Sequence, residues 1–173
     1  MRICRLALSN GCRHNPLAMA SPTRTGSARR TATRKPGRRS VLVTGASGGI
    51  GRAICRAFAA AGRYDGVHYH RQKAEAAKTL RAVRVTGGTG GLFQADVREA
   101  ESVRRMIDAF IKKAPKPTAF ICNAGIAASS LVLRQREDEW MSVIQTNLTG
   151  TFLCLQAMAP PLFAQGGGSI VVI

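Results

Sequence analysis

The stretch Ser40-Val-Leu-Val-Thr-Gly-Ala-Ser-Gly-Gly-Ile-Gly51 decides the fold of this chain. Its first four residues include a short apolar, β-branched run, which is typical of a strand buried on both faces. Thr44-Gly45 interrupts this run, and from Gly49 apolar residues recur at helical spacing, at positions 50, 54, 57, 58 and 61. The stretch therefore predicts a strand, a tight glycine turn and a helix whose N-terminus forms an anion site.

The glycines of this turn have separate roles. Gly45 allows the sharp turn, Gly49 allows a phosphate to approach the backbone, and Gly51 allows the helix to pack close to the strand. Their spacing, Gly-x-x-x-Gly-x-Gly, differs from Gly-x-Gly-x-x-Gly. A triphosphate-binding loop is disfavoured, because Ile50-Gly51 stands where such a loop carries its lysine.

The net charge of +17 is concentrated at the N-terminus. Residues 1–40 contain ten Lys/Arg and no acidic residue, whereas residues 41–173 contain sixteen basic and nine acidic residues. A segment so rich in Ser, Thr, Arg, Gly and Pro cannot bury enough apolar surface to fold. We therefore predict a basic disordered leader over residues 1–39 and a single α/β domain over residues 40–173.

Three hypotheses remain for the leader. It has no function of its own, or it is an organelle transit peptide, or it is an arm that binds nucleic acid. The arm is disfavoured because its only aromatic ring is His14, which leaves nothing to stack on bases. A cytoplasmic protein is expected under the first hypothesis, and a mitochondrial or plastid protein under the second.

Composition disfavours two further classes of protein. No apolar run approaches the ~18 residues of a membrane span, so no membrane partner is expected. The five cysteines show neither Cys-x-x-Cys nor Cys/His spacing, which predicts a reducing compartment and no metal site.

Strand and helix patterns alternate along the rest of the domain. Strands are expected at 66–69, 92–95, 119–122 and 169–173, and helices at 74–85, at 98–113 and from about 138. We expect a flexible turn at 86–91, and we expect Pro160-Pro161 to kink or end the last helix. This alternation predicts a parallel sheet with right-handed crossovers and helices on both faces.

The polar motifs follow the predicted strands. The glycine turn comes after the first strand, Asp96 after the third and Asn123-Ala-Gly125 after the fourth. Ligands bind such sheets beyond the carboxyl ends of the strands, so these motifs are expected to share one site.

With Thr44-Gly-x-x-x-Gly-x-Gly51, Asn123-Ala-Gly125 and Thr146-Asn147 in this order, residues 40–173 resemble the short-chain dehydrogenase/reductase family. The segments Asp138-Glu-Trp and Thr146-Asn-Leu-Thr-Gly-Thr-Phe152 are most similar to the 3-oxoacyl-(acyl-carrier-protein) reductases within it. The resemblance implies a Rossmann-like doubly wound parallel sheet, here truncated after its fifth strand.

The resemblance also implies how a nicotinamide cofactor is held. The glycine turn would bind the pyrophosphate, Asp96 and Val97 the adenine, and the Asn123 segment the adenosine side. An alternative for Asp96 is a helix N-cap. The expected cofactor-binding residues are Gly45, Ser47, Gly48, Gly49, Ile50, Gly51, Arg71, Asp96, Val97, Asn123, Ala124 and Gly125.

The end of the second strand bears on the choice between NADP(H) and NAD(H). Asp65 has the spacing of a carboxylate for the ribose hydroxyl, but the strand continues past it. Arg71 follows the strand and could pair with a 2′-phosphate, or it could simply be solvated. We therefore expect NADP(H) rather than NAD(H).

The resemblance assigns Asn147 as the catalytic asparagine, which in the family holds a water of the proton relay. The serine and the Tyr-x-x-x-Lys of the family follow the fifth strand, whereas this sequence ends at Ile173. Tyr69-His-Arg-Gln-Lys73 has the right spacing, but it lies at the adenosine end and is rejected as the catalytic pair. We therefore expect a family oxidoreductase whose chain as given is inactive.

The expected function is NADPH-dependent reduction of a 3-oxoacyl thioester, on a small-molecule or acyl-carrier-protein-bound ketone. The uncharged segment Ala164–Gly168 argues against carrier-protein docking, because relatives that dock it carry basic residues there. Two alternatives remain open: reduction of another ketone, or nucleotide binding without catalysis. A full-length form is expected to be a homo-oligomer.

Overall fold

The computed structural model describes residues 3–6 and 39–173. The strands among these residues form a single six-stranded sheet. The strand order is β1-β6-β5-β2-β3-β4, in which β2 to β6 are all parallel and β1 is antiparallel to β6. The strands are β1 (Ile3–Leu6), β2 (Ser40–Val43), β3 (Tyr64–Tyr69), β4 (Thr89–Gln94), β5 (Pro117–Cys122) and β6 (Gly168–Val172).

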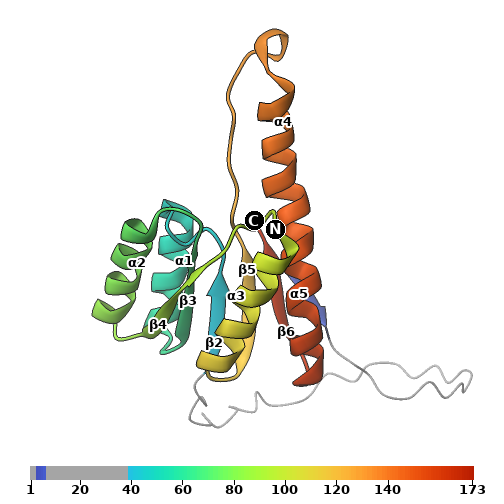
Figure 1. The fold of residues 1–173 in the computed structure, drawn as a ribbon. Coiled ribbons are helices and arrows are strands. Elements are labelled where there is room, and N and C mark those ends of the chain that lie inside the picture. Colours follow the sequence, from blue (N-terminus) through green and yellow to red (C-terminus); the bar gives the residue numbers. More distant parts are fainter. Residues whose placement is uncertain (1–2, 7–38) are drawn as a thin grey trace, which may run out of the picture.

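Helices cover both faces of this sheet, with α1 and α2 on one face and α3 and α5 on the other (Figure 1). The α-helices are α1 (Gly49–Ala60), α2 (Lys73–Val85), α3 (Ala100–Lys113), α4 (Glu137–Ile144) and α5 (Gly150–Ala164). A short 3₁₀ helix, η1 (Val132–Arg134), precedes α4, and a π-helical turn, η2 (Gln145–Thr149), joins α4 to α5. The expected doubly wound α/β fold is confirmed.

The path of the chain creates a crevice above the centre of the sheet. From β2 the chain winds outward through β3 to β4, and then returns through α3 to place β5 on the other side of β2. The crossovers therefore leave in opposite directions at β2 and β5. A reversal of this kind opens a ligand crevice at the carboxyl ends of the two strands.

Helix α1 packs on the sheet through a face that only partly overlaps the expected one, since Ile54 and Phe58 are half-buried against the core. Its buried residues are Gly51, Cys55 and Ala59, whereas Ile50 is 64% exposed. The apolar spacing was misleading because a stripe of small side chains brings the helix close to the sheet. A Cβ on Gly51 would lie 2.6 Å from the Gly45 carbonyl oxygen, so the close contact requires glycine.

The flexible turn expected at 86–91 is wrong in its second half, because β4 already begins at Thr89. Its residues pair in register with β3, and a Cβ on Gly90 would lie 2.3 Å from the Asp65 carbonyl oxygen. Close approach of two backbones therefore explains Gly90 better than a need for flexibility.

Pro160 and Pro161 do not end the last helix, since α5 continues to Ala164. Proline removes one backbone donor and normally disrupts a helix interior. Here the packing of α5 outweighs that cost, because Cys154, Met158 and Leu162 are all buried in the core beneath it.

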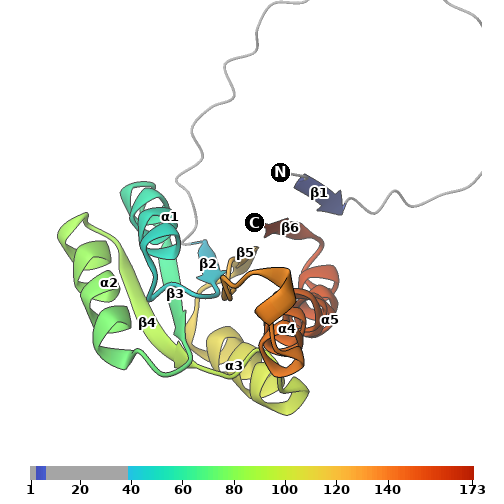
Figure 2. The same ribbon diagram turned by 90° about the horizontal axis from the view of Figure 1, so that it is seen from above.

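The edge of the sheet at β6 is paired with a further strand. Four residue pairs join β1 to β6, from Ile3 with Val171 to Leu6 with Gly168 (Figure 2). Strand β1 belongs to the segment expected to be disordered; residues 1–2 and 7–38 of that segment lie outside the described residues.

Helix α5 touches the loop after β4 through a glycine. Gly150 is buried, and a Cβ on it would lie 2.9 Å from Cγ2 of Val97. Helix α4 and the loop before it project beyond the sheet (Figure 1), and no residue of α4 is buried. No helix among the described residues is long and apolar enough to span a membrane.

Candidate functional site

The carboxyl ends of β2 and β5 are joined by the side chains of Thr44 and Asn123. The Thr44 hydroxyl accepts hydrogen bonds from the backbone N–H groups of Asn123 and Ala124, each at 2.9 Å, and donates to the Ile121 carbonyl at 3.2 Å. The Asn123 side-chain amide donates to the Thr44 carbonyl at 2.9 Å. These bonds fix the floor of the crevice.

The glycine turn begins directly after Thr44, and its first residue, Gly45, has a left-handed backbone conformation. Gly45 has a φ of +63°, which favours glycine, and a Cβ there would lie 2.8 Å from Cα of Ala124. The backbone N–H groups of Gly45, Ala46 and Gly48 are all bonded within the protein.

The next N–H groups are free to bind a ligand. Those of Ser47, Gly49, Ile50 and Gly51 find no acceptor in the described part of the chain. They surround the N-terminus of α1, where the helix dipole favours negative charge. The arrangement suits a phosphate or pyrophosphate.

Two adjoining hollows extend from the turn. One of about 290 Å³ is lined by the glycine turn and by Gln72, Asn123 and Gly125. The other, of about 380 Å³, shares Gly45, Ser47, Gln72 and Gly125 with the first. It adds the residues that follow β3, β4 and β5, which include His70, Arg71, Asp96, Val97, Ala124 and Ile126. The structure thus brings all twelve expected cofactor-binding residues to one crevice.

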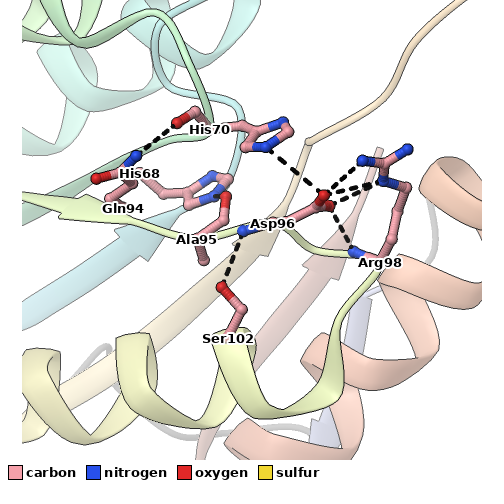
Figure 3. A network of polar contacts seen from close by, with 7 residues as sticks. All are labelled: His68, His70, Gln94, Ala95, Asp96, Arg98 and Ser102. Carbon is pink, nitrogen blue, oxygen red and sulfur yellow. Dashed lines mark hydrogen bonds and ion pairs between the residues drawn. The ribbon is translucent and has the colours of Figure 1, made fainter.

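Asp96 is the centre of a polar network at the far end of this crevice (Figure 3). Its carboxylate accepts hydrogen bonds from the Arg98 guanidinium at 2.5–3.1 Å and lies 3.6 Å from Nε2 of His70. The bonds from Arg98 lower the pKa of Asp96 to about 2. Asp96 is not the N-cap of α3, because that position is Glu99. The carboxylate therefore stays charged at neutral pH and can accept a further donor.

His68 is a buried member of this network that the sequence analysis missed. Its Nδ1 accepts a hydrogen bond from the Gly45 N–H at 2.9 Å, and its Nε2 lies 3.2 Å from the Ala95 carbonyl oxygen. The side chain links the glycine turn to the end of β4. The available signal was a histidine placed within a strand otherwise expected to be buried.

Asn147 lies in the π-helical turn η2, next to the loop that follows the Asn123 segment. Its side chain accepts from the Ile126 N–H at 2.9 Å and donates to the Ile126 carbonyl at 3.0 Å. Single π-helical turns within helices are frequent at functional sites. Ile126 also lines the larger hollow, so Asn147 is connected to the crevice through one residue.

The three cysteines whose side chains the structure describes are not part of this site. Cys55, Cys122 and Cys154 are buried free thiols, and burial raises the pKa of each to about 12. They act as small apolar side chains of the core. Within residues 3–6 and 39–173, no group of three or more potential metal ligands was found.

Comparison with known proteins relates residues 39–173 to a model of the short chain dehydrogenase family. The FabG 3-oxoacyl-[acyl-carrier-protein] reductase of Staphylococcus aureus is 36% identical over 133 residues, which are 77% of this chain and 54% of the relative. The 3-oxoacyl-[acyl-carrier-protein] reductase of a Synechocystis species is 36% identical over 132 residues, 76% of this chain and 53% of the relative. The chain therefore spans about half of the length of these relatives.

A solved structure shares the fold. A short-chain dehydrogenase/reductase from Burkholderia xenovorans aligns with a TM-score of 0.67 and 24% sequence identity. The alignment covers 72% of this chain and 53% of the other.

Proposed function

This chain belongs to the short-chain dehydrogenase family. On that premise we propose that it forms the nucleotide-binding part of an NADPH-dependent reductase of 3-oxoacyl thioesters. One observation carries the nucleotide part of this proposal. N–H groups that find no acceptor within residues 3–6 and 39–173 lie at the N-terminus of α1, beside a crevice at the point where the strand order reverses. That place suits the pyrophosphate of a dinucleotide.

The residues of the crevice fit the rest of such a cofactor. Ser47 and Gly49–Gly51 would hold the pyrophosphate, Asp96 and Val97 the adenine, and Arg71 a 2′-phosphate. Arg71 is exposed and lines the same hollow as Asp96, which allows both to contact one ligand. The bound cofactor would supply the hydride that reduces the ketone.

Asn147 would hold a water of the proton relay at the other end of the cofactor. Its side-chain bonds to Ile126 fix the η2 turn beside the crevice. Both tyrosines of this sequence, Tyr64 and Tyr69, precede Asn147 in the chain and lie in β3. We therefore propose that these 173 residues alone bind nucleotide without reducing a ketone.

The substrate class rests on the relatives, which are named as 3-oxoacyl-[acyl-carrier-protein] reductases. An acyl-carrier-protein-bound ketone is the proposed substrate, and a longer form of the protein is proposed to be a homo-oligomer. Reduction of another small ketone is the second candidate, favoured by the uncharged Ala164–Gly168 segment.

Calorimetric titration of the chain with NADPH and NADH tests the cofactor. We expect NADPH to bind more tightly, and we expect Arg71→Ala to remove the difference, because the 2′-phosphate loses its cation. Arg84→Ala is the matched control, since Arg84 is an exposed arginine in the last turn of α2, away from the crevice. It should leave both affinities unchanged.

Equal affinities for NADPH and NADH in the unmodified chain would contradict the choice of NADP(H). Absence of binding to either nucleotide would contradict the proposed function as a whole. Ketone reduction by these 173 residues would contradict the non-catalytic assignment of the chain as given.

A further inference from the structure

His68 makes hydrogen bonds to two different parts of the site. Its Nδ1 accepts from the Gly45 N–H, and its backbone carbonyl accepts from the Ala46 N–H, both at 2.9 Å. On the other side of the ring, Nε2 contacts the Ala95 carbonyl, just before Asp96. One residue therefore connects the glycine turn with the adenosine end of the crevice.

Only one protonation state of the ring satisfies both partners. The Gly45 N–H is a donor, so Nδ1 must be unprotonated, and the Ala95 carbonyl is an acceptor, so Nε2 must carry the hydrogen. In the charged ring Nδ1 also carries a hydrogen, so the Nδ1–H group and the Gly45 N–H group, both donors, would face each other.

The surroundings also favour this neutral state. The ring is only 2% exposed, and burial lowers the pKa of His68 to about 4. The charged groups that act on it are Asp96, which opposes this shift, and His70, which adds to it. At neutral pH the ring is therefore a fixed acceptor for the turn.

We propose that His68 is a positioning residue that holds the glycine turn in its phosphate-binding conformation through the neutral Nε2–H tautomer. By engaging the N–H groups of Gly45 and Ala46, this residue leaves those of Ser47 and Gly49–Gly51 directed at the ligand. The role in binding rests on the proposed nucleotide function, whereas the tautomer and its bonds do not.

Two substitutions separate the bonds of the ring. In His68→Asn, the side-chain oxygen can occupy the place of Nδ1 and accept from Gly45, while the contact with Ala95 is lost. In His68→Gln, the longer side chain can keep a donor for Ala95 but has no acceptor near Gly45. Both variants remove the ring from the core, so both are expected to lose stability.

Two measurements on the full 173-residue chain test the proposal. Ring ¹⁵N chemical shifts should show the Nε2–H tautomer at pH 7 without nucleotide. NADPH titration should show His68→Gln weakened about tenfold, the factor for one lost hydrogen bond, and His68→Asn within about threefold of the unmodified chain. The Gly45 amide should exchange with solvent faster in His68→Gln than in His68→Asn.

Equal loss of affinity in the two variants, or an Nδ1–H tautomer, would overturn the positioning role and leave His68 as a core residue only. If the unmodified chain does not bind NADPH, the proposed function fails. The tautomer and the Gly45 exchange rates still decide the role of His68 in that case.

Discussion

Thr44 has one hydroxyl group that serves three backbone groups. It accepts from two N–H groups of the segment after β5 and donates to the Ile121 carbonyl, and the side chain is 1% exposed. A buried N–H that loses its acceptor cannot turn to water. The junction between β2 and β5 therefore depends on this oxygen atom.

Replacing Thr44 by valine should destabilise the protein because the part-buried N–H groups of Asn123 and Ala124 would lose their acceptor. We expect the free energy of unfolding to fall by about 2 kcal/mol, because the two groups are only part-buried and each should cost about 1 kcal/mol, the lower end of the usual range. Thr44→Ser keeps the hydroxyl and should lose only about 1 kcal/mol for the missing methyl group. Urea unfolding followed by circular dichroism measures both; similar losses would show that packing, not hydrogen bonding, dominates.

At the scale of single residues, the sequence correctly predicted the positions at which a close backbone contact requires glycine. Gly45 and Gly51 were predicted from spacing alone, and the structure shows that a side chain would collide with backbone at both. The sequence offered His68 only as a histidine within a buried strand, because its role depends on Gly45 and Ala95, which reach the ring only when β3 pairs with both β2 and β4. Local patterns carry no information about such a contact.

The π-helical turn η2 is the element that places Asn147 beside the crevice. Asn147→Ala should free the segment after β5, because the Ile126 N–H and carbonyl lose their partners. Since Asn147 is exposed, water replaces part of the interaction, and we expect the free energy of unfolding to fall by only about 0.5–1.5 kcal/mol.

Hydrogen exchange checks this expectation at the Ile126 amide, which should exchange faster in Asn147→Ala. Gln145→Ala, an exposed residue of the same turn, is the matched control and should leave that rate unchanged. Equal rates in all three proteins would show that the loop is held by other contacts.

The alternation of strands and helices was sufficient to predict the five parallel strands and the helices between them, whereas β1 lies in the segment expected to be disordered. The errors arose where tertiary contacts outweigh local preference. Small residues at 51, 55 and 59 determine the buried face of α1, while Gly90 allows β4 to approach β3. The prolines of α5 are tolerated above a packed core.

At the scale of the whole molecule, Asp65 is a buried carboxyl group whose titration makes stability depend on pH. It is 0% exposed, and neither carboxylate oxygen has a hydrogen-bond partner among the described residues. Burial raises the pKa of Asp65 from 3.8 to about 7, although Arg63 opposes this shift. The folded state therefore favours the protonated acid more than the unfolded state does.

The sign of the effect follows from linkage. Between pH 4 and 7 the unfolded chain binds fewer protons at Asp65 than the folded chain, so stability falls as pH rises. Asp65 should contribute a loss of about 4 kcal/mol over this window, at 1.36 kcal/mol per pKa unit. Asp65→Asn should remove this contribution and be more stable at pH 7.

Unfolding in urea at several pH values measures this slope. The exposed Asp108→Asn serves as the control and should retain the slope of the unmodified protein. An unchanged slope in Asp65→Asn would mean that other groups determine the pH dependence.

The contact between Gly150 and Val97 constrains how related sequences can diverge. Helix α5 leaves no space for a methyl group at position 150 while valine occupies position 97. Over evolutionary time alanine at position 150 should therefore accompany alanine or glycine at position 97, whereas position 97 can become smaller while glycine remains at position 150. An alignment of related sequences in which alanine at position 150 regularly accompanies valine at position 97 would refute this coupling. If the coupling holds, the helix that follows the asparagine turn and the loop that follows β4 share one inherited constraint.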